Sequence, residues 1–97
     1  MYLILTSRPG QFRTELVEGL RRIESCDYLF FGRCKARVVI AEVASDCRVA
    51  VIDETPPEVV NHVPVKFFEK FETVELARAA LRQLVHEDDA DVRLVPT

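Results

Sequence analysis

Apolar and polar residues alternate in short runs along this chain, and proline- or glycine-containing breaks separate the runs. Residues 2–6 form the first run. Arg8-Pro9-Gly10 ends it, because proline fixes φ and glycine accepts a positive φ. β-Branched and aromatic runs with a period of two residues are typical of strands. We therefore expect the first strand over residues 2–6.

Three further runs of this kind follow closely between residues 27 and 53. They cover residues 28–31, 35–43 and 47–53, with turn residues at 32–34 and 44–46. Links this short join antiparallel neighbours, because a parallel crossover needs a dozen or more residues. The pattern predicts a β-meander over residues 27–53.

The pattern changes to a helical period near the C-terminus. Thr73 is a candidate N-cap, and an apolar stripe repeats at helical spacing. The acidic residues 87–91 then predict a solvated turn before a last strand over residues 92–95. We expect a helix over residues 73–86 whose buried stripe is formed by Val74, Ala77, Leu81, Leu84 and Val85.

Two stretches are open to more than one interpretation. In residues 14–24, Leu16, Leu20 and Ile23 share one helical face, which favours a short helix, whereas Gly19 favours an extended arm. Residues 59–71 are apolar, but Pro64 restricts them to a helical turn followed by a short edge strand.

Together these elements predict an α+β fold, in which an antiparallel sheet of about five strands has one face covered by the C-terminal helix. The chain has 97 residues, 48% of them hydrophobic, which is enough for a single domain over residues 1–97. No apolar run approaches the ~20 residues that span a bilayer. The three glycines lie too far apart to build a phosphate-binding loop.

The three cysteines are irregularly spaced and contain no C-x-x-C pair, so they predict reduced structural thiols in a cytoplasmic protein. Neither a metal nor a cofactor is indicated, because zinc ligands usually come as close pairs. Cys34 lies between Arg33 and Lys35, two cations that favour a thiolate. It is therefore the candidate for a reactive thiol and, in a minor interpretation, for a nucleophile.

Cations and aromatic residues gather in the hairpin over residues 28–37. If its second strand is regular, Lys35 and Arg37 share one face. Tyr28 and Phe30 beside these cations resemble the stacking platforms of single-stranded nucleic-acid binders, although the net charge of −3 argues against that use. We expect contact with an acidic partner or a small anion through Arg8, Arg13, Arg33, Lys35 and Arg37.

Phe67, Phe68 and Phe71 form the densest aromatic group outside the meander. They either pack under the helix or form an exposed interface, because a small domain has more surface than core. The sequence thus favours a non-catalytic interaction module, an accessory or regulatory subunit that homodimerises or docks on a larger protein. The alternatives are a small-anion-binding protein or small enzyme that uses the arginines and Cys34, and a single-stranded nucleic-acid binder.

Overall fold

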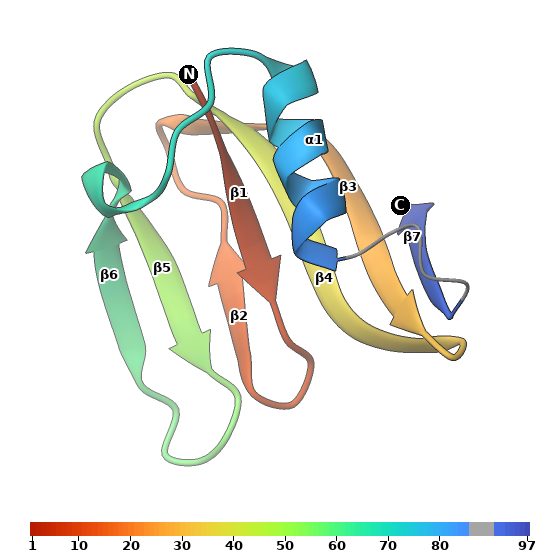
Figure 1. The fold of residues 1–97 in the computed structure, drawn as a ribbon. Coiled ribbons are helices and arrows are strands. Elements are labelled where there is room, and N and C mark those ends of the chain that lie inside the picture. The colour runs from red at the N-terminus through yellow and green to blue at the C-terminus, as the bar shows by residue number, and fades with distance from the viewer. Residues whose placement is uncertain (86–90) are drawn as a thin grey trace.

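The computed structural model describes residues 1–85 and 91–97. This part of the chain forms seven strands, one 3-10 turn and one α-helix, and Figure 1 shows how they are arranged. In chain order the elements are β1 (Tyr2–Ser7), β2 (Phe12–Glu15), β3 (Leu20–Phe30), β4 (Arg33–Val43), β5 (Arg48–Asp53), β6 (Val60–Pro64), η1 (Val65–Phe67), α1 (Val74–Val85) and β7 (Val92–Pro96).

The strands form two antiparallel sheets rather than one. The larger sheet has the order β1-β4-β3-β7, and the smaller has the order β2-β5-β6. Helix α1 lies across one face of the larger sheet, over β1 and β4 (Figure 1). The α+β class and the covering helix are confirmed, whereas the expectation of a single sheet of about five strands is wrong.

A serine side chain explains why the first hairpin divides between the sheets. Arg8 and Phe12 pair through their backbones at the turn, so the next pair of a regular hairpin would join Thr6 to Thr14. The N–H of Thr14 instead donates to Oγ of Ser7 at 2.9 Å. The side chain thus takes the donor that would have continued the ladder, and β2 turns away to pair with β5.

The short helix expected over residues 14–24 is wrong, because this stretch contains the end of β2, a turn and the start of β3. Gly19 adopts a φ of +101°, which a helix does not allow. A Cβ atom at this position would lie 2.7 Å from Oγ of Ser45. The glycine therefore serves a tight turn where residues 44–45 pass close to the backbone.

Only the first half of the predicted meander is formed. β3 and β4 are paired as a hairpin, with its turn at Phe31 and Gly32 instead of residues 32–34. β5 does not pair with β4 but lies between β2 and β6. The N–H of Ala44 donates to the carbonyl of Gly19 at 2.8 Å, so the chain after β4 is held at the β2–β3 turn and continues into the other sheet.

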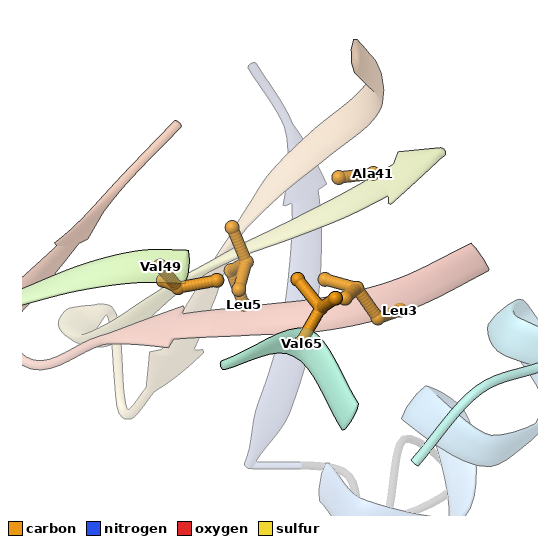
Figure 2. Packing of buried hydrophobic residues seen from close by; sticks show 5 residues of the cluster. All are labelled: Leu3, Leu5, Ala41, Val49 and Val65. Carbon is orange, nitrogen blue, oxygen red and sulfur yellow. The ribbon is translucent and has the colours of Figure 1, made fainter. Parts of the chain in front are cut away.

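The main core lies between the two sheets. Leu3 and Leu5 on β1 meet Val49 on β5 and Val65 on η1, with Ala41 of β4 beside them (Figure 2). These five side chains are at most 3% exposed. The opposite face of the larger sheet carries the helix, whose Ala77 and Leu81 are also buried. Both faces of β1 and β4 are therefore covered.

The helix begins where the sequence predicts. The N–H of Leu76 donates to Oγ1 of Thr73 at 3.1 Å, so Thr73 caps the first turn. The prediction for Leu84 is wrong, because this residue continues the stripe of Ala77 and Leu81 but is 71% exposed. Within the described ranges no helix is long and apolar enough to cross a membrane. His86 and most of the predicted acidic turn lie outside the described residues.

Residues 59–71 form the two predicted elements in the opposite order. The edge strand β6 comes first and ends at Pro64, and the 3-10 turn η1 follows. Proline fits this position because β6 is an edge strand, whose outer side requires no N–H donor. The last strand, β7, pairs with β3 as an edge of the larger sheet.

Candidate functional site

The predicted basic hairpin is present, but its cations do not form one row. Arg33, Lys35 and Arg37 are exposed, and Nε of Arg37 donates to Oδ1 of Asp27 at 3.0 Å. Tyr28 pairs with Ala36 and Leu29 with Cys34, so Lys35 is the extra residue of a β-bulge. The condition for Lys35 and Arg37 to share one face, a regular strand, is therefore not met.

The two remaining predicted arginines lie in different places, since Arg8 directly follows Ser7, the partner of Arg37 in β4, whereas Arg13 pairs with β5. Arg13 belongs to the smaller sheet, where its Nε donates to Glu15 at 3.1 Å and its Nη1 lies 3.7 Å from Glu54. The hydrogen bond to Glu15 raises the pKa of Arg13, and the hydrogen bond to Asp27 raises that of Arg37. Arg13 and Arg37 thus each have a carboxylate partner in their own sheet. Arg8 is exposed at the first turn.

The cysteines lie on three different strands or turns. Cys34 is exposed, and its Sγ donates to the carbonyl of Ala36 at 3.6 Å. Cys47 is half-buried, and this burial, followed by the nearby charge of Asp46, raises the pKa of its thiol. Across residues 1–85 and 91–97, no three His, Cys, Asp or Glu side chains are grouped to hold a metal ion.

The aromatic residues of the hairpin divide between core and surface. Phe30 is half-buried, whereas Phe31 is 67% exposed at the turn and its ring meets that of Phe30 edge-on at 4.5 Å. Phe31 has a φ of +51°, a conformation that a bulky side chain rarely adopts. The hairpin therefore presents one aromatic ring to solvent beside Arg33.

The predicted interface group divides in the same way. Phe67 is 71% exposed, and Phe68 packs against the core cluster. Phe71 is half-buried, and its backbone pairs with Tyr2 at the edge of β1. Phe68 thus packs on the core between the two sheets instead of under the helix, and an interface at the exposed Phe67 stays a prediction.

A groove runs between β1 and α1, next to Phe71. It has a volume of about 410 Å³. Its apolar lining comes from Ile4, Phe71, Ala80 and Leu84, and Glu69 supplies a carboxylate. Leu84, which the helical stripe predicts to be buried, lines this groove instead of the core. The groove therefore accounts for its exposure.

The backbone of β1 is open along this groove. Tyr2 exchanges two hydrogen bonds of 2.8 Å with Phe71, and Arg8 exchanges bonds of 2.8 and 3.0 Å with Phe12. These bonds show that the even-numbered residues of β1, Ile4 and Thr6 among them, direct their N–H and C=O groups away from β4. On that side, neither residue forms a backbone hydrogen bond with any part of the chain that the structure describes.

A second cavity, on the other side of α1, contains residues that the sequence predictions missed. It has a volume of about 370 Å³ and is lined by Arg22 of β3 and by Arg78 and Arg82 of α1. The spacing of Arg78 and Arg82, four residues apart, places them on one helical face and was visible in the sequence. The sequence does not show that they line the same cavity as Arg22, because this depends on how the helix lies on the sheet.

Comparison with known proteins identifies no relative of this chain. It matches no family, and neither the curated proteins nor the solved structures contain a significant match.

Proposed function

We propose that this protein is a non-catalytic protein-binding module that accepts an extended segment of a partner at the open edge of β1. The observation that carries the proposal is the pair of residues Ile4 and Thr6, whose outward N–H and C=O groups have no backbone partner on that side within the described chain. An added strand satisfies such groups, which is how sheet edges recognise extended peptides.

The length of the segment follows from the bonds that limit the gap. Phe71 pairs with Tyr2 at one end and Phe12 with Arg8 at the other. In the gap between these two backbone pairs, an antiparallel partner segment forms hydrogen bonds with Ile4 and Thr6. The two partner residues that form these bonds have one residue between them in the segment. About three residues of the partner therefore enter, and their neighbours leave the edge at both ends.

The side chains of the groove specify what the segment carries. Ile4, Phe71 and Leu84 form an apolar wall on one side of the edge. Alternate side chains of a strand lie on one face, so the two pairing residues present apolar side chains to this wall. Glu69 favours a basic residue next to them. The partner segment is thus short, apolar at alternate positions and flanked by a lysine or arginine.

A partner protein fits this edge better than a second copy does. In a second copy, β1 is bounded by the same backbone pairs at Tyr2 and Arg8, so two such edges cannot approach each other closely. Of the two modes that the sequence leaves open, docking on another protein is therefore the one we propose. The exposed Arg33 and Lys35 then accelerate association with an acidic partner surface, because charges outside the contact act mainly on the rate of encounter.

Selection from a displayed library of random peptides tests this function and does not require the partner to be identified first. We expect the selected peptides to contain apolar residues at two alternate positions with a basic neighbour. On binding, the amide hydrogens of Ile4 and Thr6 should become protected from exchange, since they then donate to the added strand. Peptides without this pattern, or binding without protection of these two amides, would contradict the proposal.

A pair of helix variants provides the matched control. Leu84→Glu places a charge in the groove, whereas Leu76→Glu places the same charge at a residue that is 52% exposed on the same helix and outside the groove lining. We expect Leu84→Glu to weaken peptide binding by roughly tenfold or more and Leu76→Glu to leave it unchanged. Equal losses in the two variants would place the peptide elsewhere on the helix.

A further inference from the structure

The cavity on the opposite side of α1 has an apolar floor. Val38 and Ile40 of β4, Leu81 of α1 and Leu94 of β7 all line it. Its volume of about 370 Å³ lies within the range of small-molecule sites. Leu81 belongs to the core, so this floor is part of the fold and its position is fixed by packing.

The rim of the same cavity is basic. Three arginines, Arg22, Arg78 and Arg82, line it together with Glu24. Arg78 holds Glu24 through two bonds, Nε to Oε1 at 2.6 Å and Nη2 to Oε2 at 3.0 Å. Thr97 also lines the cavity, where its Oγ1 lies 2.6 Å from Oγ of Ser25.

Electrostatics favour the ionised form of the Glu24 carboxylate at this rim. The hydrogen bond from Arg78 lowers the pKa of Glu24 most, and the charges of Arg78 and Arg82 add to the effect. Glu24 therefore neutralises one guanidinium group and fixes its orientation. Arg22 forms no ion pair with any residue that the structure describes, so its guanidinium group can accept a ligand.

A β-bulge shapes the β3 side of the cavity. Arg22 pairs with Ala41 and Glu24 with Ile40, so Ile23 is an extra residue in β3. Bulges re-aim neighbouring side chains and are frequent beside binding sites. Here Arg22, Ile23 and Glu24 all contribute to the lining, which a regular strand with alternating faces does not allow.

From this combination we infer that the cavity is a binding site for a small organic monocarboxylate with an apolar body. The carboxylate binds at the rim through Arg22, with Arg82 nearby, and the apolar body rests on Ile40, Leu81 and Leu94. The ionised Glu24 repels a compact polyanion such as phosphate. Phosphate would also leave the apolar floor of the cavity exposed to water. This site goes beyond the proposed peptide groove and does not depend on it.

Three probes separate the contributions of charge and apolar surface. Benzoate has both features, benzyl alcohol has the same ring without the charge, and inorganic phosphate has charge without the ring. In a titration followed by backbone amide NMR, we expect saturable benzoate shifts at Ser25 and Cys26. Benzyl alcohol and phosphate should bind at least roughly tenfold more weakly, because each lacks one of the two contacts.

Neighbouring arginines of β3 provide the matched variants. Arg22→Gln removes the rim charge, whereas Arg21→Gln removes an exposed guanidinium group that pairs with Glu42 at 2.9 Å and does not line the cavity. We expect Arg22→Gln to weaken benzoate binding by roughly tenfold or more, as the loss of a charged hydrogen bond does, and Arg21→Gln to have no effect. Circular dichroism checks that both variants are folded.

Four outcomes would overturn the inference. They are the absence of saturable binding, phosphate or benzyl alcohol binding as tightly as benzoate, equal losses in Arg21→Gln and Arg22→Gln, and benzoate shifts confined to Ile4 and Thr6. The last result would assign the ligand to the peptide groove. Failure of the peptide selection has no bearing on these measurements.

Discussion

The two sides of α1 differ in what they offer a ligand. Towards β1, the groove presents unpaired backbone groups and an apolar wall that includes the exposed Leu84. Towards β3 and β7, the cavity presents arginine side chains above an apolar floor. Backbone groups recognise an extended peptide of many sequences, whereas guanidinium groups recognise a particular anion. One helix thus separates two kinds of recognition.

The difference arises in the sheet rather than in the helix. On the β1 side the sheet ends early, because Ser7 diverts Thr14 and β2 leaves for the other sheet. On the other side the sheet continues through β3 to β7, and after the bulge at Ile23 the side chain of Glu24 bonds to Arg78 of the helix. Where no strand follows β1, backbone groups at the sheet edge stay unpaired. Where β3 has an additional residue, side chains line a cavity.

The largest expected effect comes from truncating the two stripe leucines of α1. Leu81 is 7% exposed and Leu84 71%. Leu81→Ala should lower the free energy of unfolding by about 2–4 kcal/mol through lost burial and a cavity. Leu84→Ala should change it by less than about 0.5 kcal/mol. Urea denaturation measures both, and a similar loss in the two variants would mean that the β1 groove is closed in solution.

Removing the Ser7 hydroxyl tests why the β1 edge is open. In Ser7→Ala the N–H of Thr14 loses its acceptor, which should cost about 1 kcal/mol or less, because the carbonyl of Thr6 can replace it. That replacement extends β2 along β1 and closes the peptide site. We expect peptide binding to fall while benzoate binding is retained. Unchanged peptide binding would show that Ser7 does not hold the edge open.

Ser45→Ala is the control for this change, because Ser45 is an exposed turn residue outside both lining sets. Its substitution should leave peptide and benzoate affinities unaltered. Amide exchange of Thr14 distinguishes a redirected bond, in which the amide stays protected, from a lost one.

A smaller effect is expected from the ion pair of the arginine cavity. The folded-state pKa of Glu24 is lowered, so its contribution to stability is present above its ordinary pKa of about 4.5 and is lost as the pH falls through the folded-state value. At pH 7, Glu24→Gln should lose less than about 1 kcal/mol, because both side chains are partly exposed. The two proteins should become equally stable in acid.

Glu69, in the groove between β1 and α1, provides the control for the stability measurement on Glu24→Gln. Glu69 forms no ion pair with the part of the chain that the structure describes, so Glu69→Gln should leave stability at pH 7 within about 0.5 kcal/mol of the parent protein. If the loss in Glu24→Gln persists in acid once the carboxylate is protonated, its cause is packing and not charge.

The smallest effect is a change in the rate of thiol modification. Cys26 lines the arginine cavity, whereas Cys34 is exposed on the hairpin and Cys47 is half-buried with a raised pKa. With iodoacetamide followed by mass spectrometry, we expect Cys34 to react fastest and Cys47 slowly. Benzoate should slow the reaction of Cys26 alone. A slower reaction at all three thiols would indicate a general effect on stability.

Local features of the fold could be predicted from the sequence. Thr73 and the apolar stripe identify α1, and the period-two runs identify β1 and the β3–β4 hairpin. These signals are contained within a few consecutive residues, as propensities and caps are. Residues 14–24 show the limit of that reasoning, since the helical spacing of Leu16 and Leu20 is incidental to a turn that Gly19 requires.

The division into sheets and the two sites depend on distant pairs of residues. The bond from Thr14 to Ser7 and the register of Ile40 with Glu24 are set by how strands meet, which composition does not record. Among the predicted arginines, Arg13 and Arg37 each pair with a nearby carboxylate, which their positions in the sequence do not reveal. Three further arginines line one cavity where a helix and a strand cross.

The bulge at Ile23 has a further consequence for how this chain tolerates changes in length. On either side of it, Arg22 keeps Ala41 and Glu24 keeps Ile40 as partners, so deleting Ile23 leaves every other pair of β3 and β4 unchanged. The fold should accept a version that is one residue shorter, with a regular strand and without the contribution of Arg22 to the rim of the cavity. Insertions and deletions are usually confined to loops, but in this protein a site within a strand can be lost or acquired by one codon while the architecture persists.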